Sequence, residues 1–126
     1  MSRSMPPELS KAEYNVLHQL WRQSPMSVRE LHDALDNQWA YTTTKTVMDR
    51  MVAKELLARE QVHGVNVYRP LIRRSQGVMQ WIKFLADKVL ELDRSEVLNM
   101  FAKKDLYTKE EMAEMRKLLE QDNDGD

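Results

Sequence analysis

Hydroxyl and basic side chains gather between residues 42 and 50 in a pattern that suits contact with a nucleic acid. The members of this group are Thr42, Thr43, Lys45, Thr46 and Arg50. Lysine and arginine neutralise phosphates or read guanine, and threonine offers a hydroxyl to bases or phosphates and a methyl group to thymine. Asp49 lies in the same stretch and is repelled by phosphate. It either accepts from a cytosine amino group or pairs with Lys45.

An ordinary solvated helix face has a similar composition, so the surrounding elements decide between the two interpretations. Apolar residues recur every three or four positions along 11–23, 28–36 and 43–57, which predicts three amphipathic helices. The group of polar residues falls on the third of them. Val47, Met48 and Met51 form the apolar face of that helix, which leaves the polar group towards solvent or a partner.

The expected helix starts carry residues that satisfy the free backbone amides of a first turn. Capping boxes are predicted for Ser10 with Glu13, Ser27 with Glu30, Asp93 with Glu96 and Thr108 with Glu111. Thr42 or Thr43 is expected to cap the third helix, a role that is compatible with phosphate binding at a helix N-terminus. Ser10 and Arg29, at the first two helix starts, are further candidates for phosphate contacts.

A β-hairpin is predicted directly after the third helix. Residues 57–62 and 65–70 are rich in Val, Tyr and Leu, and His63-Gly64 between them can turn the chain. Three helices and a hairpin in this order are typical of a winged helix-turn-helix, a mainly α fold with a small β wing. Its third helix enters the major groove and its wing touches the DNA backbone. Candidate contacts in the wing are Arg59, His63, Asn66 and Arg69.

The apolar period changes beyond residue 75. A seam with steps of four and three residues runs through Val78, Ile82, Leu85, Val89 and Leu92, as in a short coiled coil. Two shorter helices are expected at 94–103 and 109–120. Their apolar residues include Val97, Leu98, Phe101, Met112, Met115 and Leu119. A tail of about 50 residues does not easily bury so much apolar surface alone, so we expect it to pack against a second copy.

These patterns divide the chain into four parts. They are a disordered lead-in at 1–8, a winged-helix DNA-binding domain at 9–72, a three-helix dimerisation domain at 73–121 and a frayed acidic end at 122–126. The formal charge is +3 over residues 1–75 and −4 over residues 76–126, and a mildly basic first half suits an anionic partner. A protein–protein interaction module that uses the winged helix without sequence-specific DNA binding is the alternative.

Composition excludes several other classes. The absence of cysteine rules out disulfides, thiolate metal sites and a cysteine nucleophile. His18, His32 and His63 are far apart, so we expect no metal and no cofactor. Three glycines provide no phosphate-binding loop, no HExxH motif is present, and no enzyme is expected. No apolar run approaches the roughly 20 residues of a membrane span, and no secretory signal is recognised, so we expect a cytoplasmic protein.

The chain resembles the penicillinase-repressor family (the BlaI/MecI type) from about residue 9 to residue 120. The similarity rests on Leu9-Ser10-Lys11-Ala12-Glu13-Tyr14 with Leu20-Trp21, on Ser27-Val28-Arg29-Glu30-Leu31, on Trp39, on Thr43-Thr44-Lys45-Thr46-Val47 with Arg50, on Tyr68-Arg69-Pro70-Leu71, and on Val97-Leu98-Asn99 and Lys104-Asp105-Leu106 in the tail. The combination of Ala-Glu and Leu-Trp with Lys-Thr-Val in the third helix is fairly specific to the family.

This resemblance implies a homodimeric bacterial repressor that binds an inverted-repeat operator. Family members join an N-terminal winged helix to a C-terminal helical dimerisation domain. The best-studied ones control resistance to β-lactams and are inactivated by proteolysis after a membrane sensor detects the antibiotic. The family's scissile Asn-Phe bond would fall at Asn99-Met100, with Phe101 one place later. A sibling branch senses copper through cysteines, which this chain lacks.

Overall fold

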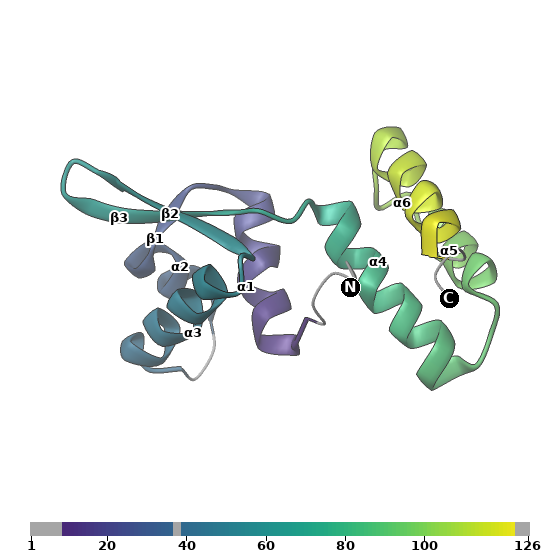
Figure 1. Cartoon of the computed structure of the whole chain (residues 1–126), viewed down its shortest axis with the longest axis horizontal. Helices are drawn as coiled ribbons and strands as arrows, with labels where there is room; N and C mark the ends of the chain where they lie inside the picture. Colours follow the sequence, from purple (N-terminus) through teal and green to yellow (C-terminus); the bar gives the residue numbers. More distant parts are fainter. Residues whose placement is uncertain (1–8, 37–38, 123–126) are drawn as a thin grey trace. The chain divides into compact units, whose positions relative to one another are not determined.

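The computed structural model describes residues 9–36 and 39–122, with side chains described as far as residue 120. The chain folds into two compact units. The first unit is Leu9–Arg73 and the second begins at Arg74, and Figure 1 shows the elements of each. The expected lead-in at 1–8 and most of the expected acidic end lie outside the described residues. Asp122, which was assigned to that acidic end, is the last residue of a helix instead.

The first unit has the three helices and the hairpin predicted for a winged helix-turn-helix, in the predicted order, and a short strand between the first two helices that was not predicted. Its helices are α1 (Lys11–Arg22), α2 (Val28–Ala34) and α3 (Tyr41–Ala53), and its strands are β1 (Met26–Ser27), β2 (Leu57–Val62) and β3 (Val65–Pro70). The strands form an antiparallel sheet in the order β1-β3-β2. The β2–β3 hairpin, which is the wing, extends beyond the helices of its unit (Figure 1). The mainly α fold with a β wing is therefore confirmed.

One apolar core holds these helices and the sheet together. Leu17 and Leu20 of α1, Leu31 of α2 and Met48 and Met51 of α3 are at most 1% exposed. With the buried Val16 and Val28, the core residues of α1 and α2 lie three or four positions apart, and those of α3 lie three apart. Each helix therefore turns one apolar stripe towards the others. Burial of such side chains is the main source of stability, at about 1.5–3 kcal/mol for each fully buried one.

Three of the four predicted capping boxes are present. At α1, the Glu13 amide donates to the Ser10 hydroxyl at 3.1 Å and the Ser10 amide donates to the Glu13 carboxylate at 3.0 Å. The boxes at Ser27 and Thr108 have the same two hydrogen bonds. Asp93 also caps its helix, but its carboxylate accepts from the amide of Ser95.

The predicted start and end of α3 were wrong. The helix begins at Tyr41 with Ala40 as its N-cap, and no side chain caps it. Because helical geometry starts earlier than expected, Thr42 and Thr43 lie inside the first turn and not at the cap position. At the other end α3 stops at Ala53, and Glu55 reverses the chain with a left-handed φ of 64° before β2 begins.

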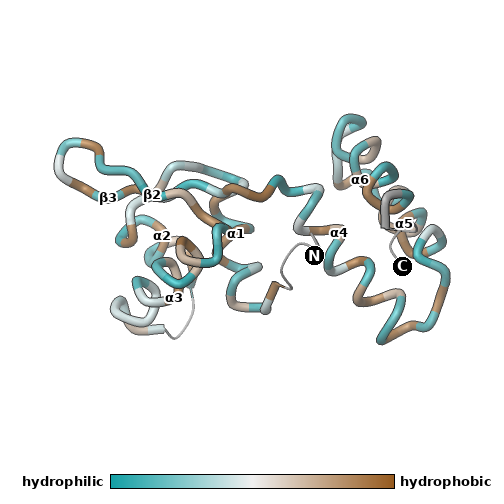
Figure 2. Tube along the Cα trace, in the orientation of Figure 1, coloured by the Kyte–Doolittle hydropathy of each residue, from teal (hydrophilic) through white to brown (hydrophobic). Residues whose placement is uncertain are grey.

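The second unit consists of helical segments. They are α4 (Arg74–Phe84), the π-helical segment η1 (Leu85–Leu90), α5 (Arg94–Ala102) and α6 (Lys109–Asp122). Hydrophobic segments recur along α4 and the stretch that follows it (Figure 2). Val78, Ile82, Ala86, Val97, Leu98 and Met115 are buried, so this unit has a core of its own.

The expected regular seam from Val78 to Leu92 is interrupted. At Leu85 the backbone changes from α-helical to π-helical hydrogen bonding, which adds a residue to the turn and shifts the phase of the following side chains. Val89 and Leu92 are consequently 56% and 44% exposed, whereas Val78 and Ile82 are buried. Glu91, with a left-handed φ of 54°, then ends the segment.

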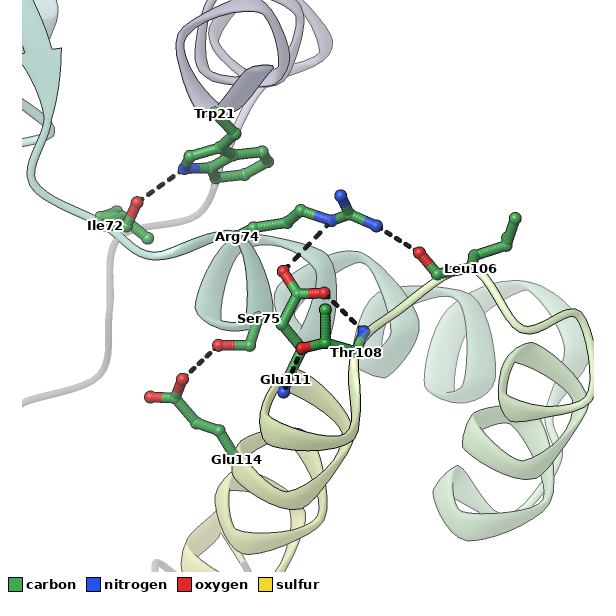
Figure 3. A network of polar contacts seen from close by, with 8 residues as sticks. All are labelled: Trp21, Ile72, Arg74, Ser75, Leu106, Thr108, Glu111 and Glu114. Atoms are coloured by element: carbon green, nitrogen blue, oxygen red, sulfur yellow. Dashed lines mark hydrogen bonds and ion pairs between the residues drawn. The ribbon is translucent and has the colours of Figure 1, made fainter. Parts of the chain in front are cut away.

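Polar contacts tie the start of α4 to α6 and to the loop before α6 (Figure 3). The Arg74 guanidinium donates to the Leu106 carbonyl at 2.5 Å and lies 3.5 Å from a carboxylate oxygen of Glu111. The buried Ser75 hydroxyl donates to the Glu114 carboxylate. In the first unit, the Trp21 indole donates to the Ile72 carbonyl at 2.7 Å and so secures the chain just before the unit ends.

Candidate nucleic-acid interface

Helix α3 has one buried face and one exposed polar face. Thr44, Met48 and Met51 are buried. The exposed side carries the hydroxyl and basic residues singled out from the sequence, namely Thr42, Thr43, Lys45, Thr46 and Arg50. The structure therefore brings all five to one accessible helix surface, which we call the α3 face.

Thr44 has a different role from its threonine neighbours. It is fully buried, and its hydroxyl lies 3.0 Å from Nδ1 of His32 in α2. The first turn of α3 is further attached to α2 through Tyr41, whose ring meets the His32 ring edge-on and lies 4.6 Å from the Arg29 guanidinium carbon. Arg29, which was expected to contact a phosphate, thus lies beside the start of α3.

The wing presents its candidate residues on two opposite faces. Arg59 pairs with Tyr68 in the strand register, so both side chains lie on one face of the sheet, and Asn66 lies on the same face. Arg69 projects from the other face, where its guanidinium lies 3.7 Å from the Glu60 carboxylate. The alternation of side chains thus separates Arg69 from the wing residues that share a face with Tyr68.

The tip of the wing is a tight turn at His63 and Gly64. Both residues have a positive φ, 51° and 81° respectively, as a two-residue turn of type I′ requires. The glycine was expected from the sequence, whereas the left-handed conformation of His63 was not. Val62 and Val65 pair across the turn and are 42% and 52% exposed, so the tip is accessible.

Asp49 connects the α3 face to the wing. Its Oδ2 accepts from Lys45 Nζ at 2.8 Å, which confirms the pairing that the sequence suggested. Its Oδ1 accepts from Arg59 at 3.2 Å and from the Tyr68 hydroxyl at 3.0 Å. The contacts to Arg59 and Tyr68 were not predicted, because the strand register that brings these two side chains to α3 has no signal in the local sequence.

The charges around Asp49 stabilise its ionised form. Burial alone would raise the pKa of this carboxyl, but the hydrogen bonds from Lys45 and Tyr68 and the nearby Arg59 charge hold the pKa below its ordinary value. The hydrogen bond to Asp49 in turn raises the pKa of the Lys45 ammonium. For Tyr68, burial and then the hydrogen bond to Asp49 raise the pKa of the hydroxyl. At neutral pH the cluster therefore has one carboxylate facing two cations.

Ser10 is occupied as the cap of α1. Its capping partner Glu13 also accepts from Lys54 Nζ at 2.5 Å, which joins the start of α1 to the C-terminal end of α3. Burial raises the pKa of the Glu13 carboxyl, but Lys54 and the Ser10 amide lower it more, so the net pKa is below the ordinary value. The structure thus gives Ser10 a structural role in orienting the helix that supports α3.

The residues predicted for dimerisation fall into two groups. Val78, Ile82, Val97, Leu98 and Met115 are buried in the core of the second unit. Six others remain partly or fully accessible, namely Leu85, Val89, Leu92, Phe101, Met112 and Leu119. The exposed apolar surface of this unit also includes Phe84, Leu90, Met100 and Leu106, which were not among the predicted residues.

Asn99 and Met100, the predicted cleavage position, lie within α5. Both are exposed, and Met100 is 52% accessible. The Asn99 side-chain oxygen accepts from Arg116 of α6 at 3.3 Å. Both residues are thus at the surface, and the bond between them is part of a helix.

The described residues offer neither a metal-binding cluster nor a membrane-spanning helix. Within residues 9–36 and 39–122, no group of three or more His, Asp or Glu side chains is placed to hold a metal ion. In the same part of the chain, every helix is too short or too polar to cross a bilayer.

The fold and the α3 face define a winged helix-turn-helix unit followed by a helical unit. A solved structure of a MarR family protein from Bacillus stearothermophilus has a similar fold, with a TM-score of 0.50 and 21% identity over 91% of this chain and 73% of that chain. The model of the penicillinase repressor family matches residues 9–121. The chain therefore belongs to the penicillinase repressor family, as the sequence predicted, and it is not an enzyme.

Curated relatives match along nearly their whole length. The penicillinase repressor of Staphylococcus aureus is 24% identical over 89% of this chain and 90% of the relative. The penicillinase repressor of Bacillus licheniformis is 29% identical over 91% of each chain. The methicillin resistance regulatory protein MecI of Staphylococcus aureus is 27% identical over 89% of this chain and 93% of the relative.

Proposed function

We propose that this protein is a homodimeric transcriptional repressor that binds an inverted-repeat DNA operator through α3. The observation that carries the proposal is the α3 face, on which five hydroxyl and basic side chains are exposed while the opposite side of the same helix is buried. Inserted in a major groove, this face offers Lys45 and Arg50 to phosphates or guanine and the threonines to bases, phosphates or thymine methyl groups. Membership in a family of repressors supports the same function.

The wing is proposed to contact the backbone next to the groove that α3 occupies. Arg59, Asn66 and the turn at His63 are the best placed residues, because the first two share the sheet face of Tyr68, which contacts α3 through Asp49. Arg69 and Arg29 are proposed as additional phosphate contacts. Thr42 and Thr43 at the start of α3 add backbone amides that favour an anion.

A second copy of the chain is proposed to cover the exposed apolar surface of the second unit. Phe84, Val89, Leu90, Leu92, Met100 and Leu106 are each more than 40% exposed, and a partner that covers such apolar side chains removes them from water. A two-fold dimer presents the same surface twice and places two α3 helices for two half-sites. Those half-sites should lie about one turn of DNA apart, or a multiple of it.

The mechanism follows from the linkage of the two copies. Once one α3 is bound, the second half-site is reached at a high effective concentration as long as the dimer holds. Bound over a promoter, the dimer excludes polymerase. Any signal that separates the copies releases the operator, and cleavage between Asn99 and Met100 is one such event, because it divides α5 next to the buried Leu98. Because the proposed operator is bacterial DNA, the protein is proposed to act in the cytoplasm.

The proposal is tested by fluorescence anisotropy with a labelled duplex from the region upstream of the gene for this protein. A scrambled duplex is the control, and both are titrated at low and near-physiological salt. We expect selective binding that saturates at two subunits per site and weakens steeply with salt, by about 0.9 log units in affinity per log unit of salt for each phosphate contact. Binding that neither discriminates between the duplexes nor responds to salt would favour the protein–protein module.

A further inference from the structure

Asp49 places a negative charge on the helix face that is proposed to meet DNA. It lies on α3 between the proposed DNA contacts Thr46 and Arg50, and its side chain is about one third exposed. A carboxylate in this position repels phosphate and weakens binding to any duplex. Its contacts therefore need an explanation beyond ordinary helix solvation.

The same carboxylate neutralises two of the cations that are proposed to meet DNA. Lys45 Nζ and Arg59 Nη1 lie 2.8 Å and 3.2 Å from its two oxygens, and these side chains are 55% and 43% exposed. Both cations are therefore accessible to a phosphate, yet each is paired within the protein. A phosphate that takes either cation must first separate it from Asp49.

Tyr68 fixes the position at which this exchange takes place. Its hydroxyl donates to Asp49 Oδ1 at 3.0 Å, and its ring is 1% exposed. Because Arg59 is opposite Tyr68 in the strand register, the wing delivers its cation to the same oxygen. The arrangement is thus anchored in the core and is more than a chance meeting of flexible surface side chains.

We propose that Asp49 keeps Lys45 and Arg59 paired on arbitrary DNA and so lowers the affinity of the α3 face for DNA that lacks the operator sequence. On the correct site, base contacts from the α3 face supply the free energy needed to separate the pairs, and both cations then move to phosphates. On other sequences that contribution is absent and the pairs persist. This inference rests on the proposed function, because it concerns how tightly the same surface holds DNA that lacks the operator sequence.

The expected effect is measurable as a change in affinity for random-sequence DNA and in the salt dependence of that affinity. Two exposed ion pairs together correspond to roughly a two- to thirtyfold change in binding. With Asp49→Asn, we expect affinity for a random-sequence duplex to rise by about that factor. The slope of log affinity against log salt should steepen by up to about 1.8, because two cations become free to release counterions. Affinity for the upstream duplex should rise at least as much, because separation of the pairs costs the wild type binding free energy there that the variant keeps. The salt slope on the upstream duplex should change less, because both cations already meet phosphates in that complex.

The experiment compares the full-length wild type, Asp49→Asn and two control variants by anisotropy on both duplexes over a salt series. Asp33→Asn changes the net charge equally at an exposed position of α2. Tyr68→Phe removes the hydroxyl anchor but leaves both ion pairs. We expect the random-duplex affinity and salt slope of Asp33→Asn to stay near those of the wild type. Those of Tyr68→Phe should change less than those of Asp49→Asn, because both ion pairs remain. Thermal unfolding of each variant verifies that the unit remains folded.

The outcomes separate this inference from the proposed function. Equal non-specific affinity and salt slope in Asp49→Asn and Asp33→Asn would overturn the role of Asp49 while leaving a wild type that binds its site selectively. A rise in random-duplex affinity in Tyr68→Phe as large as that in Asp49→Asn would also overturn it, since wing position and not the ion pairs would then limit non-specific binding. A wild type that binds neither duplex would remove both proposals.

Discussion

Replacing Val89 by Asp is expected to separate the proposed dimer without unfolding either unit. Val89 is 56% exposed, so a carboxylate at this position stays hydrated in a single copy. In a two-fold dimer the residue occurs twice. Covering the exposed parts of two valines contributes about 2 kcal/mol, and enclosing two unpaired carboxylates costs several kcal/mol more. A total of about 4–6 kcal/mol raises the dissociation constant of the dimer by roughly 10³- to 10⁴-fold.

Sedimentation equilibrium over a range of protein concentrations measures this change directly. Ala113→Asp is the matched control, because it adds the same charge at an exposed position of α6. We expect the control to remain dimeric and Val89→Asp to sediment as a monomer, with thermal unfolding showing that both are folded. Operator affinity should fall with the dimer, because the tether between half-sites is lost. A Val89→Asp variant that stays dimeric at the same concentrations as the control would refute this placement of the interface.

Three further predictions concern the first unit. Lys45→Ala should weaken operator binding and reduce the salt slope by about 0.9, as measured by anisotropy. Because Lys45 is exposed, the unfolding midpoint should stay unchanged, and an unchanged salt slope would show that Lys45 meets no phosphate. Met48→Ala should lower the free energy of unfolding by about 2–5 kcal/mol in urea titrations, because Met48 is fully buried; a smaller loss would mean that the core collapses around the site. Lys54→Met should destabilise the unit at neutral pH. The pKa of Glu13 is lowered in the folded state from an ordinary value of 4.5, so this stabilisation is present above that pH and lost as pH falls through the lowered pKa. The stability curves of variant and wild type should therefore converge in acid, and a constant difference would contradict a charge effect.

The elements that sequence patterns predicted correctly are those controlled by local chemistry. Spacing of apolar residues placed the helices, and the pairing of Ser10 with Glu13 marked the start of α1, because both signals act within one or two helical turns. The hairpin was predicted to the residue, since Gly64 between two β-rich runs requires a turn. The exposed side of α3 followed from the same periodicity once Met48 and Met51 were assigned to the core.

The parts that were missed depend on contacts between distant residues. Thr44 was not set apart from its threonine neighbours, yet it is buried against His32 of another helix. The contacts of Asp49 with Arg59 and Tyr68 arise only after the wing has folded onto α3. The change to a π-helix at Leu85 altered a seam whose spacing looked regular. In each case a tertiary contact or a backbone irregularity overrides a pattern that is read from neighbours alone.

The central claim, that α3 lies in the DNA groove and does so twice per operator, is tested most directly by affinity cleavage. The chain has no cysteine, so Thr42→Cys at the start of α3 can carry a single iron chelate that cuts DNA nearby. We predict two clusters of cleavage about one helical turn apart, or a multiple of it, on the upstream duplex. The same chelate at Ala113→Cys on α6 serves as the control. Cleavage that is absent with the Thr42→Cys label, or no different from that of the control, would contradict the placement of α3 on DNA.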